Sequence, residues 1–112
     1  MRRLLAGVLV LALAGVLSAS ALAATRTITI GDNFFVRDNA GTPTVTVRKG
    51  TKVRFKWVGN APHNVQVQRG PARFKSKVKT SGTYSRTLRK KGTYRLVCIV
   101  HASEMKLTLK VR

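Results

Sequence analysis

The sequence predicts an all-β domain, a Greek-key sandwich of about seven short strands. After residue 23, apolar and polar residues alternate over short runs, which is the period of a strand with one buried face. Gly, Pro and Asn separate these runs, and no stretch keeps the helical period long enough to indicate a helix. Strands this short and this closely spaced are typical of two sheets packed face to face.

The first 23 residues have the layout of a secretory signal peptide. Two arginines precede an apolar run from Leu4 to Leu17, and small residues follow as far as Ala23. Cleavage there leaves one domain, residues 24–112, whereas an uncleaved segment would tether that domain to a membrane. We therefore expect an exported protein, located in the periplasm, outside the cell or on the cell surface. The sequence has no second apolar run, so no transmembrane helix is expected.

The expected strands cover most of the remaining chain. In chain order they run over residues 26–30, 44–48, 52–58, 63–68, 72–79, 83–88, 93–100 and 105 or 106 to 111. The strand at 52–58 shows the alternation most clearly, because Val53, Phe55 and Trp57 are separated by basic residues. These three side chains are expected to lie in the core, with the basic ones in solvent.

Three further patterns lie in the C-terminal half. In segment 72–79, Phe74 and Val78 are expected on the face opposite the basic residues. The strand at 93–100 carries apolar residues on both faces, so it is expected to be central in its sheet. In the last strand, Leu107, Leu109 and Val111 are expected to point inward, because lysine and threonine alternate with them.

Basic residues dominate the charge. Without Arg2 and Arg3, 20 of the 22 bases remain against three acids, which gives the mature domain about +17 at neutral pH. A charge of this size favours acidic partners and repels other copies of the chain, so we expect a monomer. An exported protein rarely meets nucleic acid, and nucleic acid is not expected as a partner. Proteins with an acidic docking surface, anionic membranes and cell-wall polymers remain as partners.

Rare side chains gather in one short stretch, Cys98 to Met105. It holds the only cysteine, one of the two histidines, His101, and one of the two methionines. A single cysteine cannot form an internal disulfide, so it is a free thiol, an intermolecular bridge or a ligand. The other histidine, His63, follows a loop that can lie beside the end of the Cys98 strand in a sandwich. Taken singly, a buried cysteine is usually a small hydrophobe, and Met105 can also be a core residue that opens the last strand.

Taken together, two imidazoles, a thiolate and a thioether suit a copper ion that alternates between Cu(I) and Cu(II). Hydrolytic chemistry needs other groups, such as a general base beside an open zinc position. The only acids are Asp32, Asp38 and Glu104, and of these Glu104 alone is near the cluster. One carboxylate does not make a hydrolase, so no enzymatic activity is expected.

These motifs resemble the small blue copper proteins, or plastocyanin-like cupredoxins, over nearly all of the chain after the leader. The matching segments are Phe34-Phe35, residues 45–51 and 53–57, His63-Asn64-Val65, residues 92–98, His101 and residues 105–111. The resemblance implies a cupredoxin-like fold in which His63, Cys98 and His101 are equatorial copper ligands. Met105 would be the axial ligand. Asn64 would lie outside the ligand set, and its amide would tie the His63 loop to the cysteine loop.

The chain departs from the family pattern near these ligands. Three residues separate His101 from Met105, where relatives more often have two or four, which leaves the axial distance open. The proline that often follows the cysteine or the second histidine is absent, because Ile99, Val100 and Ala102 stand there.

The resemblance also implies a function, the transfer of single electrons between redox proteins. Transfer would pass through the outer edge of His101, exposed among Ala61, Pro62 and Ala102. Two other functions stay open. The domain could bind or deliver copper without transferring electrons, or it could be a cationic surface protein that binds polyanions and keeps only a vestigial metal site.

Overall fold

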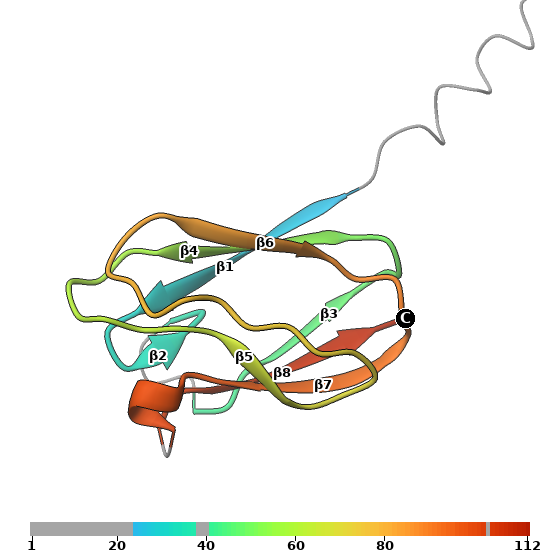
Figure 1. Ribbon diagram of the computed structural model, residues 1–112. Coiled ribbons are helices and arrows are strands. Elements are labelled where there is room, and N and C mark those ends of the chain that lie inside the picture. Colours follow the sequence, from blue (N-terminus) through green and yellow to red (C-terminus); the bar gives the residue numbers. More distant parts are fainter. Residues whose placement is uncertain (1–23, 38–40, 103) are drawn as a thin grey trace, which may run out of the picture.

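Two sheets of four strands face each other in the computed structural model, which describes residues 24–37, 41–102 and 104–112 (Figure 1). The first sheet, in the order β2-β1-β4-β6, contains β2 (Phe34–Phe35), β1 (Thr25–Gly31), β4 (Lys52–Trp57) and β6 (Thr83–Thr87). The second, in the order β3-β8-β7-β5, contains β3 (Thr44–Val47), β8 (Lys106–Val111), β7 (Gly92–Val97) and β5 (Gln66–Arg69). The predicted all-β sandwich is confirmed, with the two-residue β2 as an addition. The predicted leader, residues 1–23, lies outside the described residues.

The connections follow a Greek key. Five consecutive connections, from β2 through to β7, each pass from one sheet to the other. The pairs β1·β4 and β3·β8 are parallel, and the remaining strand pairs are antiparallel. β7 lies between β8 and β5, so this strand is internal in its sheet, as its two apolar faces predicted.

The core lies between the sheets and follows from the alternation of apolar residues. Val53, Phe55 and Trp57 of β4 are buried, and the basic residues between them are exposed. β8 buries its three alternate apolar side chains in the same way. Phe74 is buried as predicted, with its ring centroid 6.3 Å from that of Phe55. A close-packed interior of this kind is a rigid frame for the loops at its ends.

The expected strand at 72–79 is not formed, and the prediction for Val78 within it is wrong. Val78 is 48% exposed, and Ser76 is buried instead. This segment pairs with its neighbours only through isolated bridges at Lys75 and Lys79, so strand alternation does not fix the side of every residue.

The expected strand at 93–100 is too long by three residues. β7 ends at Val97, and a short 3-10 helix, η1 (Ile99–His101), follows Cys98. Ile99 and Val100 are therefore exposed, although the alternation assigned each of them to a covered sheet face. No helix within the described residues is long and apolar enough to cross a membrane.

The topology sorts the loops between the two ends of the sandwich. We call one of them the His101 end: it holds the turn after β1, the loop after β4, the turn before β6, and η1. Backbone hydrogen bonds join these segments, for example from Val58 to Ile30 at 2.9 Å and from Trp57 to Gly82 at 3.0 Å. The start of β1 and the C-terminus lie at the opposite end (Figure 1).

Candidate functional site

His63 is fully buried, and its backbone is fixed on both sides. Its N–H donates to the carbonyl of Lys79, and its carbonyl accepts from the Lys79 N–H, each at 3.0 Å. The same carbonyl accepts a hydrogen bond from Nε1 of Trp57 at 3.0 Å. Because Trp57 is a core residue, the packed interior sets the position of His63.

Asp32 holds the imidazole of His63 from the turn between β1 and β2. Its Oδ1 lies 3.0 Å from Nε2 of His63 and accepts the N–H of Ala61 at 2.9 Å. The N–H of Asn60 lies 3.1 Å from both carboxylate oxygens. These hydrogen bonds, those from the Ala61 and Asn60 backbone above all, lower the pKa of Asp32 to about 2. The ionised carboxylate can only accept, so Nε2 of His63 carries the ring proton.

The other ring nitrogen of His63 faces Cys98. Nδ1 lies 3.8 Å from Sγ of Cys98, which is also fully buried. Sγ accepts a hydrogen bond from the backbone N–H of Asn64 at 3.5 Å. Because Asp32 takes the proton-bearing nitrogen, the lone pair of Nδ1 is left on the side of the sulfur.

The side chain of Asn64 connects the chain after His63 to the chain after Cys98. Its Oδ1 accepts the N–H of Ile99 at 2.9 Å, and its Nδ2 donates to Oε1 of Gln66 at 3.4 Å. Asn64 itself is buried, and both of these bonds are partly buried. The link between the two loops is the one that the resemblance implied for this asparagine.

η1 lies within the loop that runs from Cys98 to Met105. The N–H of His101 donates to the carbonyl of Cys98 at 3.2 Å, and the N–H of Met105 donates to the carbonyl of His101 at 2.9 Å. A bond of 3.1 Å from the N–H of Cys98 to the carbonyl of Met105 closes the base of the loop. Met105 is fully buried, whereas His101 is half-buried, with its ring centroid 5.1 Å from that of His63.

The four predicted ligands therefore lie at one end of the sandwich, but they are not equally close to one another. Over residues 24–37, 41–102 and 104–112, no three His, Cys, Asp or Glu side chains form a complete metal-binding group. The structure shows a facing pair, His63 and Cys98. His101 lies beside that pair, and Met105 is buried at the base of the same loop.

The spacing of this pair fits one metal ion. In zinc sites, metal–imidazole bonds are about 2.0 Å and metal–thiolate bonds about 2.3 Å. Opened at the roughly 120° of a trigonal plane, such bonds separate the two donor atoms by about 3.7 Å. Nδ1 of His63 and Sγ of Cys98 are 3.8 Å apart. Imidazole and thiolate donors together suit copper and zinc.

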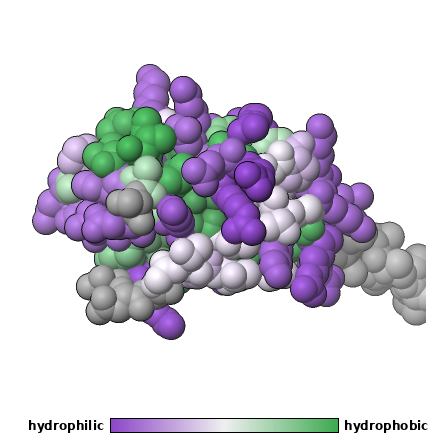
Figure 2. All heavy atoms as spheres, turned by 90° about the horizontal axis from the view of Figure 1, so that it is seen from below, coloured by the Kyte–Doolittle hydropathy of each residue, from purple (hydrophilic) through white to green (hydrophobic). Residues whose placement is uncertain are grey.

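The surface beside His101 is apolar. Ile99 and Val100 are 53% and 44% exposed, and Val58 and Val78, in segments that reach the same end, are 54% and 48% exposed. Figure 2 shows an apolar patch at the end of the molecule that carries η1, bordered by hydrophilic side chains. The three small residues that the sequence placed around His101 are half-buried or exposed as well: Ala61, Pro62 and Ala102.

Sequence reasoning missed the role of Asp32. This residue lies 31 positions before His63, and only the parallel pairing of β1 with β4 brings the two together. Its carboxylate also explains why residue 59 is a glycine, since a Cβ at that position would collide with Oδ1 of Asp32. The one signal in the sequence was that Asp32, one of three acids, stands in a turn just after an expected strand. Acids are common in turns, so this position alone does not indicate a role at the site.

Comparisons with known proteins agree with a copper site. A family model described as copper binding proteins of the plastocyanin/azurin family matches residues 31–112. A solved structure of an oxidised amicyanin mutant is 26% identical, with a TM-score of 0.65 over 81% of this chain and 90% of that one. A search of curated proteins by sequence found no match.

Two further solved structures share the fold. A purple cupredoxin from Nitrosopumilus maritimus is 18% identical, with a TM-score of 0.64 over 78% of this chain and 99% of that one. A copper-containing nitrite reductase from Thermus scotoductus SA-01 is 22% identical, with a TM-score of 0.63. That match covers 79% of this chain but 22% of the reductase chain, so the likeness is to one part of the larger protein.

Proposed function

Because the chain belongs to the plastocyanin/azurin family of copper-binding proteins and takes copper as its cofactor, we propose that it is an exported carrier of single electrons. His63, Cys98 and His101 would bind one copper ion in a plane, and Met105 would be the weak axial ligand. One observation above all supports this proposal: Nδ1 of His63 and Sγ of Cys98 face each other across 3.8 Å, with both side chains fully buried.

Bound copper supplies a one-electron couple between Cu(I) and Cu(II). The chain's own residues hold the donor atoms still. Trp57 and Lys79 fix the backbone of His63, and Asp32 fixes its ring. Donor atoms that keep their places in both oxidation states lower the reorganisation energy of electron transfer. Hydrogen bonds from residues outside the ligand set are the usual means of holding ligands in place.

Asn64 supports the sulfur ligand in two ways. Its backbone N–H donates to Sγ of Cys98, which holds the sulfur against the His63 segment. Its side chain accepts the N–H of Ile99, which holds the start of the ligand loop against the His63 segment. We infer that Asn64 keeps the two ligand segments in register and does not itself bind the metal.

Electrons would enter and leave through His101. It is half-buried, whereas His63, Cys98 and Met105 are fully buried, so it is the proposed ligand that reaches the surface. The exposed Ile99 and Val100 beside it would let a partner approach closely. The positive charge of the domain would speed its encounter with a redox protein that has an acidic docking surface, and the same charge favours a monomer.

Export is supported by the leader in the sequence. Residues 1–23 have the layout of a signal peptide, and the domain proposed for residues 24–112 contains all the elements of the sandwich. We therefore propose that the protein acts in the periplasm, outside the cell or at the cell surface.

The described acids favour a carrier over an enzyme. The carboxylate of Asp32 is occupied by His63 and by two backbone N–H groups, and Glu104 is exposed on the loop surface. A hydrolase would need a carboxylate free to act as general base beside a bound substrate. We therefore propose no enzymatic activity.

Titration of the copper-free protein with Cu(II) tests the proposal. We expect an intense visible sulfur-to-copper charge-transfer band that saturates at one copper per chain. Cys98→Ser should abolish the band, while Lys106→Gln, at an exposed position on the same end, should leave it unchanged. A colourless copper complex would rule out the type 1 site. A coloured complex that exchanges electrons with no redox partner would favour copper delivery instead.

A further inference from the structure

Exposed basic residues gather at the end of the sandwich opposite the His101 end. We call this set the basic pole. Its members are Arg26, Arg48, Lys49, Lys52, Arg89, Lys90, Lys91 and Arg112. Backbone hydrogen bonds join the segments that carry them, from Lys49 to Arg112 at 2.6 Å and from Gly50 to Leu88 at 2.7 Å.

The acids lie away from this pole. Asp32 and Glu104 both belong to the His101 end, and Asp38 lies outside the described residues. Within the part of the chain that the structure describes, no acid stands at the basic pole to neutralise it. The positive potential is therefore strongest there, and the molecule is electrically polar along the direction of its strands.

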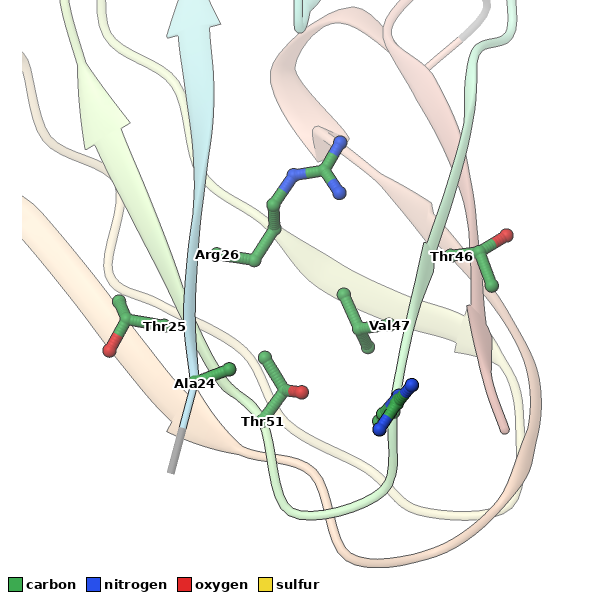
Figure 3. A pocket seen from close by; sticks show the side chains of 7 residues that line it. Ala24, Thr25, Arg26, Thr46, Val47 and Thr51 are labelled. Carbon is green, nitrogen blue, oxygen red and sulfur yellow. The ribbon is translucent and has the colours of Figure 1, made fainter. Parts of the chain in front are cut away.

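A hollow of about 270 Å³ opens within the pole, between β1 and β3. β2 pairs only with Ile30 and Gly31, so the first half of β1 is an open sheet edge, and β3 is the edge of the other sheet. Arg26 lies on the same face of β1 as Ile28 and Ile30, which points its side chain between the sheets. Figure 3 shows Arg26 reaching into the space between the two strands.

The lining of this hollow suits a phosphate group. Arg26 and Arg48 both line it, and a guanidinium binds a phosphate through two parallel hydrogen bonds. Thr51 and Val47 line the hollow as well, and Figure 3 shows their side chains between the same two strands. The volume is below the roughly 300–1,000 Å³ of drug-sized sites, which fits a group of the size of a lipid headgroup.

The chain enters the fold at this same place. Ala24 lines the hollow, and the apolar run that ends at Leu17 precedes it in the sequence. We propose that the basic pole docks on an anionic phospholipid bilayer, with a lipid phosphate bound by Arg26 and Arg48. The His101 end then faces away from the membrane, where its apolar patch is open to a redox partner. This docking goes beyond the proposed electron transfer and needs no copper.

Binding should depend on the lysines of the pole and not on net charge alone. Each basic residue close to an anionic bilayer strengthens binding about fivefold, and the effect decays within a Debye length. The sandwich is about 20 Å long, from six-residue strands at about 3.3 Å per residue. Lysines at the His101 end therefore contribute little when the pole is in contact with the membrane.

The test compares two matched triple variants of the copper-loaded protein as isolated from an exporting host. The pole variant is Lys49→Gln/Lys52→Gln/Lys90→Gln. The control variant removes the same charge nearer the His101 end: Lys56→Gln/Lys77→Gln/Lys106→Gln. Sedimentation with phosphatidylcholine vesicles, with and without phosphatidylglycerol, gives the ratio of the two affinities. An apolar leader that is still attached would insert into both kinds of vesicle. The ratio of the two affinities therefore reports only the electrostatic contribution to binding.

We expect the pole variant to lower the ratio about 100-fold and the control variant only a few-fold. Salt at about 1 M should abolish the preference for the anionic vesicles. Arg26→Gln/Arg48→Gln should weaken binding beyond the loss of two charges at Lys49 and Lys52. Equal losses in the two triple variants would overturn the docking face, and binding to soluble polyphosphate without binding to vesicles would overturn the membrane assignment. The visible copper band, read in the same samples, reports separately on the proposed electron carrier.

Discussion

The carboxylate of Asp32 lies 3.0 Å from Nε2 of His63, and it turns the other nitrogen of that ring toward Cys98. Asp32, in the turn after β1, thereby orients the proposed metal-binding nitrogen of His63, which lies 31 positions later in the chain. The ring has one hydrogen-bond donor and one lone pair, and the acceptor on Asp32 decides which nitrogen carries which.

Asp32→Ala should weaken copper binding. Without the acceptor, the ring of His63 is free to rotate and to change tautomer, and losing such an outer partner typically costs about 10- to 100-fold in metal affinity. Competition with a chelator of known affinity measures the loss. Glu104→Gln is the matched control, since it also removes one negative charge at the His101 end, from an exposed side chain. Equal affinities for Asp32→Ala and the wild type would show that the ring needs no such support.

Gly59→Ala should reproduce the effect of Asp32→Ala. A Cβ at this position would collide with the carboxylate, which must then leave His63. The copper affinity should fall while the acid itself is still present. If Gly59→Ala binds copper as tightly as the wild type, the carboxylate of Asp32 can shift away from the new Cβ and still hold His63.

The copper-free protein should lose stability in acid as Asp32 becomes protonated. The pKa of Asp32 is lowered from 3.8 to about 2, so its contribution to the free energy of unfolding is complete above about pH 4. That contribution is lost as the pH falls toward about 2, because the unfolded chain then binds the proton first. Urea unfolding of the wild type and of Asp32→Asn should converge over this range. A constant difference from neutral pH down to about 2 would contradict the prediction.

Asn64→Ala should destabilise the fold by about 1–3 kcal/mol, because it removes the buried Asn64 amide and with it the acceptor of the Ile99 N–H. Urea unfolding of the copper-free protein measures the loss. Gln68→Ala, at an exposed position of β5, is the control and should change the free energy by less than about 0.5 kcal/mol. Equal effects of the two substitutions would mean that the link between the loops contributes nothing.

Met105→Leu should keep the copper colour but shift both the visible band and the reduction potential. The substitution preserves the buried volume, so the free energy of unfolding should fall by less than about 1.5 kcal/mol. Met105→Ala adds a cavity and should cost about 2–5 kcal/mol. A spectrum and a potential that do not change in Met105→Leu would make Met105 a core residue only.

Electron exchange between oxidised and reduced copies should become faster as salt is added. Two molecules that each carry a large positive charge repel, and screening shortens the range of that repulsion to about 3 Å at 1 M salt. The rate with an acidic redox protein should change in the opposite direction. Line broadening in NMR spectra of samples that contain both oxidised and reduced protein measures the exchange rate. A rate that does not depend on salt would mean that the positive charge lies far from the surface where the two copies meet.

The elements that the sequence predicted best are those in which a single alternation decides the outcome. Val53, Phe55 and Trp57 follow a strict period of two, and burial follows it. Val78 broke the rule because its segment is held by isolated bridges, and Ile99 and Val100 broke it because the chain turns into η1 directly after Cys98. Apolar side chains in such places are free to face solvent when a loop requires it.

The candidate site was predictable only in part for a similar reason. Cys98 and His101 are close in the sequence, and the family motif adds His63, Asn64 and Met105. The position of Asp32 depends on strand pairing across the sheet, which no short motif encodes. The hydrogen bond from Trp57 to the carbonyl of His63 was likewise hidden, since the sequence identified Trp57 only as a core side chain.

That bond has a consequence for how the site would open. His63 is attached to the core by Trp57 and to the neighbouring segment by Lys79, so it can be released only when the sandwich comes apart. The loop of His101 lies on the surface and is held by a few backbone bonds. Local opening should therefore begin at the loop, with the amide of His63 exchanging its hydrogen only in global unfolding. Metal would be lost through the loop that we propose as the path of the electrons.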